Sequence, residues 1–371
     1  MLRNNCAICE HSLFTDSFKM NTTINMVSDR EYCENETFVL KFDGCCNCGC
    51  VQMRELEEPS KIYNQPLECF YGPALKKHYD LFNEFIIKSV DYREKSFFEI
   101  GGSYGRLAKL MIEKYKEKNH SIDYNILEFS AENYPEIENV KYISGNCENY
   151  DYTDIKTIIM SHVFEHLYEP RKFVNAIANN SVKNIFISIP DMDNLTINKD
   201  VNNLNIFHTY YLNTSYLTKI FNDYGYDLID SYNYENNSVF YYFTKTHQII
   251  NNDYKNIALI DNLKQFYENL QNNISNINIK DKFFICPSGF YGKFIYYNLN
   301  ERTKQNVIGF LDSDEKKIGK RLMGTHCKVF EKKEISNYEK VKILIVSEKH
   351  RNEIKYELSQ YHSDISFILL I

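Results

Sequence analysis

The sequence predicts an α/β protein built on a doubly wound, mostly parallel sheet. Residues 96–108 have the pattern of a short buried strand, a turn with three glycines and the start of a helix. From residue 96 to 247, strand and helix patterns alternate, which is typical of parallel sheets. A second unit of strand, glycine turn and helix begins near residue 283. We therefore expect a main α/β domain followed by a smaller Rossmann-like domain.

Length and charge narrow the class of protein. The chain has 371 residues, enough for two or three domains. Its formal net charge is -7 and it has no basic stretch, which argues against a nucleic-acid partner. No apolar run approaches the ~18–20 residues that span a bilayer, and the N-terminus lacks the apolar core of a signal peptide. We expect a cytoplasmic protein without a membrane partner. The sequence leaves its oligomeric state open, and a monomer is compatible with it.

Two Cys-x-x-Cys pairs near the N-terminus predict a zinc site. Such pairs present four thiolates in a tetrahedral arrangement, and Gly49 suits the tight turn after the second pair. Four cysteines leave no open coordination position, so the metal would be structural. The predicted ligands are Cys6, Cys9, Cys45 and Cys48.

The second cysteine pair has more than one register. Cys46 with Cys48, and Cys48 with Cys50, are also close in sequence, and Cys33 is a spare thiol. Only Cys45 with Cys48 keeps the two-residue spacing of the first pair. The alternative is a set of unligated thiols, which a reducing compartment would permit.

The glycine turn predicts a ligand site. Its spacing is Glu-x-Gly-x-x-x-Gly, with Glu99 in the strand and then Gly101, Gly102 and Gly105, and it differs from the dinucleotide fingerprint. Glycines at a strand-to-helix turn let a ligand approach the backbone, and the helix N-terminus presents N–H groups. Glu128 closes the second strand, 124–128, where a carboxylate can accept hydrogen bonds from ribose hydroxyls. A solvated glutamate at a strand end is the alternative.

More polar side chains follow the later strands. The third strand, 140–143, leads into a polar turn; the fourth is 157–161 and the fifth 184–190. Carboxyl ends of parallel strands meet at one edge of a sheet, where ligands bind. The residues expected at this edge, beside the glycines and Glu128, are Asn146, Cys147, Ser161, His162 and Asp191.

Three motifs carry a resemblance to a known class of enzyme. The run Ser161–Leu167, Ser-His-Val-Phe-Glu-His-Leu with Pro170 beyond it, resembles the HVxEHxxxP motif of S-adenosylmethionine (SAM) methyltransferases. The glycine turn resembles the first motif of class I members. The run Phe207–Asn213, Phe-His-Thr-Tyr-Tyr-Leu-Asn, resembles their EHxxYF segment. A helix over 215–224 and an antiparallel hairpin, 227–232 with 238–244, are expected after it.

With the cysteine module in front and a second α/β domain behind, the chain resembles the three-part nucleotide-sugar C-methyltransferases. Gly324-Thr325-His326 is similar to the PGTHIPI run of their C-terminal domain, with Met323 in place of proline. The resemblance implies a class I SAM methyltransferase core with a zinc module and a Rossmann-like domain. The expected parts are a zinc-binding module, 1–60, a SAM-binding core, 61–247, a linker helix, 248–280, and a C-terminal domain, 281–371.

The resemblance also implies chemistry and site residues. SAM would be the cofactor, a nucleotide-linked keto-deoxysugar the substrate, and His208 the base that removes a proton from carbon beside a ketone. A free histidine has a pKa of about 6.5, which suits proton abstraction at neutral pH. Tyr211 would serve as an aromatic wall or proton-transfer partner, His162 would face the methionine part of SAM, and Tyr71 would reach SAM from the N-terminal side.

Alternatives remain open at this point. Phe207 replaces the glutamate of the EHxxYF pattern, and Asn205 stands where some members have a tyrosine. His208 could instead be a histidine of a surface loop. The same fold could also methylate oxygen or nitrogen of a sugar or small metabolite, or serve as a non-catalytic interaction module. The second glycine turn, Gly-x-x-Gly at 289–292, is too short to predict bound NAD. Four cations could meet a diphosphate: Lys316, Lys317, Lys320 and Arg321.

Overall fold

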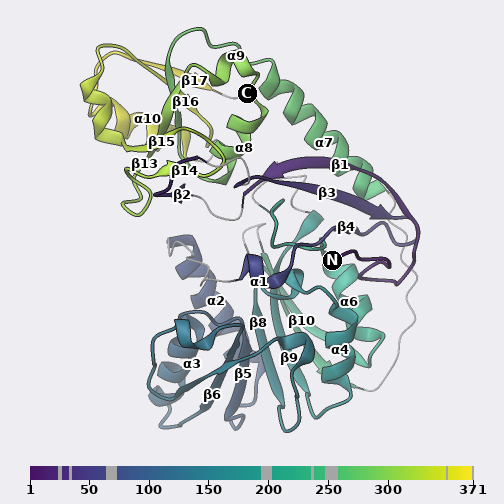
Figure 1. Cartoon of the computed structure of the whole chain (residues 1–371). Helices are drawn as coiled ribbons and strands as arrows, with labels where there is room; N and C mark the ends of the chain where they lie inside the picture. Colours follow the sequence, from purple (N-terminus) through teal and green to yellow (C-terminus); the bar gives the residue numbers. More distant parts are fainter. Residues whose placement is uncertain are drawn as a thin grey trace. The chain divides into compact units, whose positions relative to one another are not determined.

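The computed structural model places the chain in two compact units (Figure 1). It describes residues 1–23, 27–32, 36–63, 73–193, 203–234, 238–246, 258–347 and 350–369. Unit 1 comprises Met1–Ser17, Phe42–Lys199 and Phe207–Asp261. Unit 2 comprises Phe18–Lys41, Asp200–Ile206 and Asn262–Ile371. Division of the chain into four parts stays a prediction.

A seven-stranded sheet forms the centre of unit 1, in the order β10-β11-β9-β8-β5-β6-β7. The five strands from β9 to β7 run parallel, whereas β11 is antiparallel to both β9 and β10. The strands are β5 (Ser96–Ile100), β6 (Asp123–Glu128), β7 (Val140–Ser144), β8 (Thr157–Ser161), β9 (Asn184–Pro190), β10 (Tyr226–Tyr234) and β11 (Ser238–Lys245). This is the expected sheet with its antiparallel C-terminal hairpin, so the predicted fold is confirmed.

Helices cover both faces of this sheet (Figure 1). On one face, α2 (Pro73–Ser89) and α3 (Arg106–Glu117) pack on alternate strand residues. On the other face lie α4 (Pro170–Ala178) and α6 (Thr214–Asn222), where Phe221 stacks on Phe243 with ring centroids 4.5 Å apart. The side chains of the first core include Phe82, Phe85, Leu107, Met111, Phe97, Ile126, Ile159, Phe186 and Phe240. Burial of both faces explains why the central strands are almost wholly apolar.

The N-terminal segment adds a small antiparallel sheet in the order β1-β3-β4. Its strands are β1 (Phe14–Thr22), β3 (Phe38–Cys45) and β4 (Val51–Met53), and the short helix α1 (Pro59–Ile62) follows. In β3 and β4, Phe42 pairs with Met53 and Gly44 with Val51. The second cysteine pair lies at the end of β3 and in the turn that follows it.

Unit 2 has a second seven-stranded sheet, in the order β17-β16-β12-β13-β15-β14-β2. Its five strands from β17 to β15 run parallel, as expected for a Rossmann-like domain. The strands are β2 (Val27–Ser28), β12 (Phe283–Cys286), β13 (Val307–Asp312), β14 (Arg321–Leu322), β15 (Lys328–Glu331), β16 (Val341–Ile345) and β17 (Ile365–Leu369). The helices are α7 (Ala258–Ser275), α8 (Phe290–Asn298), α9 (Glu301–Lys304) and α10 (Arg351–Ser359).

Two further observations concern the predicted elements. Within the expected linker helix, 248–280, the structure has α7; residues 248–257 lie outside the described part, and residues 276–280 are not helical. In the part of the chain that the structure describes, no helix has the length and apolar character needed to cross a membrane.

Candidate active site

The glycine turn between β5 and α3 has the backbone conformation that its sequence predicts. Gly101 and Gly105 have φ of +72° and +62°, in the left-handed region that favours glycine. A Cβ on Gly101 would lie 2.4 Å from Cγ2 of Val163, and a Cβ on Gly102 would lie 2.8 Å from the carboxyl of Glu99. The absence of side chains therefore lets the loop after β8 pack directly on the turn.

Two carboxyl groups flank this turn in different environments. Glu99 is buried and accepts a hydrogen bond of 2.9 Å from the hydroxyl of Tyr124. Burial raises the pKa of Glu99 to about 8. Glu128, at the end of β6, accepts a 2.5 Å hydrogen bond from the backbone N–H of Ser103. Burial raises its pKa to about 7, against the lowering effect of that bond. Only Glu128 lies at the strand end, where a ribose-binding carboxylate is expected.

The structure also brings the other predicted edge residues to strand ends. Asn146 caps a short helical turn, because its side chain accepts a 2.9 Å hydrogen bond from the N–H of Glu148. Cys147, next to it, is buried, and burial raises the pKa of its thiol. The hydroxyl of Ser161 lies 3.1 Å from Nε2 of the buried His78. Tyr71, the remaining predicted SAM contact, lies outside the described residues.

His162 begins the loop after β8 in a left-handed conformation, with φ of 54°. Its backbone N–H donates to the carbonyl of Ser188 at 2.9 Å, and its Nε2 lies 3.3 Å from the hydroxyl of Ser238. Its Nδ1 lies 3.4 Å from Oε1 of Glu165. The His162 ring therefore lies between Ser238 of β11 and the carboxylate of Glu165.

His208 lies beside the same acid. Its Nε2 is 4.0 Å from Oε1 of Glu165, and its ring centroid is 5.1 Å from that of His166. The backbone N–H of Thr209 donates to the carbonyl of Glu165 at 3.0 Å. His208 is only 8% exposed, so it is not a histidine of a solvated surface loop. The segments that carry Glu165 and His208, more than forty residues apart in sequence, thus form one polar cluster next to the loop that contacts the glycine turn.

Glu165 is the most enclosed member of this cluster. The residue is 3% exposed. Burial by itself would raise the pKa of Glu165, but its contact with His162 and the nearby rings of His166 and His208 lower it to about 2. Burial lowers the pKa of His166. The cluster therefore contains an ionised carboxylate next to poorly solvated imidazoles.

The segment that carries His208 is held by the cysteine module. Gln52 of β4 forms an antiparallel bridge with Tyr210. The N–H of Met53 donates to the carbonyl of Thr209, and the N–H of Tyr211 donates to the carbonyl of Val51, both at 2.9 Å. Tyr211, the predicted partner of His208, is buried with its ring centroid 6.3 Å away at a steep angle. This segment is thus paired along its backbone to the strand that follows the second cysteine pair.

The four predicted zinc ligands come together, with their sulfur atoms within 4.8 Å of one another. Sγ of Cys6 lies 3.6 Å from that of Cys48, and Sγ of Cys9 lies 3.5 Å from that of Cys45. Each pair is followed by a residue in the left-handed conformation, Glu10 with φ of 61° and Gly49 with φ of 78°. The described cluster excludes Cys46 and Cys50, and Cys33 lies outside the described residues. Four convergent sulfurs in two matching turns fit a tetrahedral Zn²⁺.

Several residues at the site were not predicted. Tyr63 stacks on Phe129 with centroids 5.2 Å apart, and Phe207 lies next to Tyr63 and His166 at 6.0 and 6.1 Å. They form an aromatic wall between the end of β6 and His208. Tyr63 gave no signal in the sequence, because its partners are far away along the chain.

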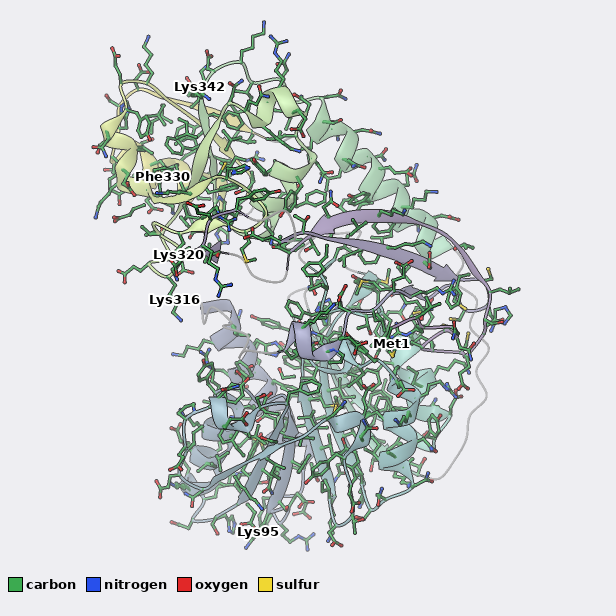
Figure 2. All side chains as sticks on the ribbon, in the orientation of Figure 1. Met1, Lys95, Lys316, Lys320, Phe330 and Lys342 are labelled. Atoms are coloured by element: carbon green, nitrogen blue, oxygen red, sulfur yellow. The ribbon has the colours of Figure 1, made fainter. Side chains whose placement is uncertain are left out.

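The cations considered for a diphosphate have acidic neighbours in unit 2. Lys317 lies 3.3 Å from Asp312, and Lys320 lies 3.7 Å from Asp29. Arg321 is buried and donates to both carboxylate oxygens of Glu36. Figure 2 labels Lys316 and Lys320, which extend from the same loop of this unit. Arg321 therefore has a structural role. The acidic partners of Lys317 and Lys320 offset the positive charge that these lysines could offer to a diphosphate.

Comparisons with known proteins give matches only among solved structures. No protein-family model matches the sequence, and no curated protein matches it. A solved structure of magnesium protoporphyrin IX methyltransferase from Synechocystis PCC 6803 with bound SAH has a TM-score of 0.38 and 11% identity, covering 47% of this chain and 84% of that one. An N,N-8-amino-8-demethyl-D-riboflavin dimethyltransferase from Streptomyces davawensis has a TM-score of 0.37 and 14% identity, covering 47% of this chain and 56% of that one. Mitomycin 7-O-methyltransferase has a TM-score of 0.37 and 11% identity, again with 47% of this chain and 56% of that one covered.

These overall scores and identities are low, and the fold class follows from the chain itself. Five parallel strands, a crossover that places the glycine turn after the central strand, and an antiparallel last hairpin make unit 1 a class I SAM methyltransferase fold.

Proposed function

We propose that the chain is a SAM-dependent C-methyltransferase that acts on a nucleotide-linked keto-deoxysugar. One observation carries the proposal: the buried His208 lies beside the ionised Glu165, which belongs to the loop that packs on the glycine turn. Transfer of a methyl group to an activated carbon requires a base close to the bound cofactor. Val163 and Glu165 belong to one loop and connect the glycine turn to His208.

The glycine turn and Glu128 would hold SAM. Ser103 fixes one oxygen of Glu128, so the carboxylate is oriented to accept hydrogen bonds from the ribose hydroxyls. Asn146 and Cys147 would flank the adenine, and Ser161 and His162 the methionine part. Bound SAM supplies the electrophilic methyl group, and its sulfur keeps the electron pair of the bond that breaks.

His208 would act on the acceptor. Its imidazole takes the proton from the carbon beside the ketone, and the electron pair of that C–H bond forms the enolate. The enolate carbon is then the nucleophile that forms the new carbon–carbon bond. The imidazolium lies 4.0 Å from Oε1 of Glu165, whose negative charge stabilises it in this poorly solvated site. Tyr211 would form part of the acceptor wall.

We also propose that Cys6, Cys9, Cys45 and Cys48 bind a structural zinc ion. The closed set of four sulfurs offers no position for substrate. The contribution of the module to function would be indirect, through the pairing of β4 with the segment that carries His208.

The test uses purified protein with a nucleotide-linked 4-keto-6-deoxysugar in D₂O, with and without SAM, and mass spectrometry of the sugar. We expect gain of one methyl group with SAM and enzyme-dependent deuterium uptake without it. His208→Asn should lose both while still binding SAM, and the exposed His350→Asn is the matched control. Methyl gain without exchange would contradict C-methylation and indicate an O- or N-methyltransferase. No methyl gain and no exchange, despite SAM binding, would contradict the substrate class.

A further inference from the structure

A second group of metal-ligating side chains lies in the described part of unit 1. One ligand atom each from Glu165, His166 and His208 lies within 4.8 Å of the other two. Glu165 and His166 come from one helical turn, and His208 comes from the segment that pairs with β4. The three side chains thus converge from two separate segments rather than from one stretch of helix.

The carboxylate of Glu165 is the second, independent observation. Both its oxygens are buried, and neither has a hydrogen-bond partner within the described ranges. The groups that face Oε1 are Nδ1 of His162 at 3.4 Å and Nε2 of His208 at 4.0 Å, both longer than a good charge-assisted hydrogen bond. A buried carboxylate without donors is costly, and a cation between it and the imidazoles would remove that cost.

His166 is also oriented for such a role. Its Nδ1 lies 3.4 Å from the hydroxyl of Tyr63, a contact that can fix the ring. Metal-bound histidines are commonly held by a second-shell partner on the other ring nitrogen.

We infer that Glu165, His166 and His208 form a binding site for one divalent transition-metal ion of the Zn²⁺ or Co²⁺ type. One carboxylate and two imidazoles suit such ions, whereas Mg²⁺ and Ca²⁺ prefer oxygen ligands alone. Three protein ligands leave coordination positions for water or for oxygen atoms of a bound molecule. The site differs from the cysteine cluster, which is closed and made only of sulfur.

Metal binding itself is independent of the proposed reaction, but its consequence rests on the proposed function. A ligand nitrogen of His208 donates its lone pair to the ion, so the same nitrogen cannot accept a proton from the acceptor. An occupied site would therefore inhibit deuterium exchange, and removal of the ion would restore it.

The experiment uses the full-length, tag-free chain with the cysteine cluster filled by zinc and titrates it with Co²⁺. We expect one additional equivalent to bind, with visible d–d absorption and without the near-ultraviolet charge-transfer band of cobalt thiolates. Glu165→Gln and His208→Asn should weaken this binding by more than about tenfold and leave the cysteine-bound zinc in place. Exposed matched controls are Glu117→Gln and His350→Asn.

Three results would overturn the inference: no additional cobalt on the zinc-loaded wild-type chain, an additional ion with a thiolate band, or unchanged binding in folded His208→Asn. The wild-type spectrum decides the point even if Glu165→Gln does not fold. Because this titration needs neither SAM nor a sugar, failure of the proposed reaction leaves its result unaffected.

Discussion

The guanidinium of Arg3 donates hydrogen bonds to both the carbonyl oxygen and the hydroxyl of Thr209, at 2.8 and 3.0 Å. It also donates to the carbonyls of Met53 and Tyr168, each at 3.0 Å. Arg3 is 7% exposed. One buried cation therefore joins the N-terminal module, the loop after the HVFEH run, and the residue next to His208.

Arg3 is accordingly predicted to position the segment that carries His208. Arg3→Gln removes several hydrogen bonds made by a charged donor, each worth about 1.5–3 kcal/mol. We expect kcat for deuterium exchange to fall by about tenfold or more, with SAM affinity nearly unchanged, and Arg3→Lys to rescue it only in part because lysine lacks the planar fork. The exposed Arg93→Gln is the control. A parallel loss of SAM binding would indicate general unfolding instead of positioning.

Removal of zinc should act on the same segment. Cys9→Ser is expected to lower zinc content from one equivalent to near zero, to reduce the melting temperature and to reduce exchange, because β4 begins three residues after Cys48. Cys46→Ser, outside the cluster, should keep its zinc and its activity. Metal analysis, calorimetry and exchange on both variants test this. Full exchange activity in zinc-free protein would refute the coupling.

Gly101 of the glycine turn and Gly319 of unit 2 provide a matched pair of substitutions. In Gly101→Ala, the new Cβ would lie 2.4 Å from Val163, so the turn and the loop after β8 must separate. We expect SAM affinity to fall by about tenfold or more in isothermal titration. Gly319→Ala in unit 2 has a similar φ, +80°, with nothing within 4 Å, so it carries only the backbone strain. Equal SAM affinity in both variants would show that the contact with Val163 is unimportant.

Stability should fall as pH rises, because of buried carboxyls. The pKa of Glu99 is raised from 4.5 to about 8 by burial. The folded chain therefore keeps a proton that the unfolded chain releases, and this stabilising contribution is complete below pH 4.5 and lost as pH rises through 8. Glu128, with a pKa of about 7, acts in the same direction.

Urea unfolding between pH 5 and 8.5 measures this effect. Each of the two groups contributes a slope of up to about 1.4 kcal/mol per pH unit. Glu99→Gln keeps an acceptor for Tyr124 and should flatten the profile, whereas the exposed Glu117→Gln should not. A wild-type profile that is already flat over this range would be inconsistent with a protonated Glu99.

Some of the site could be predicted because its signals are local. The strand before Gly101, the positive φ of that glycine and the two matching cysteine turns each depend on a few adjacent residues. The aromatic wall of Tyr63 and Phe129, and the contacts of Arg3, join residues 50 to 206 positions apart. No spacing rule in one sequence reports such pairs.

The sequence by itself therefore determined the α/β class, the order of the strands along the chain and the grouping of the four cysteines, because periodicity and turn chemistry are properties of short segments. Only the tertiary structure decided that Glu165, His166 and His208 share one buried cluster and that β4 holds the segment beside it. These arrangements depend on which strand ends meet and on which polar groups lose water, and both follow from packing of the whole unit.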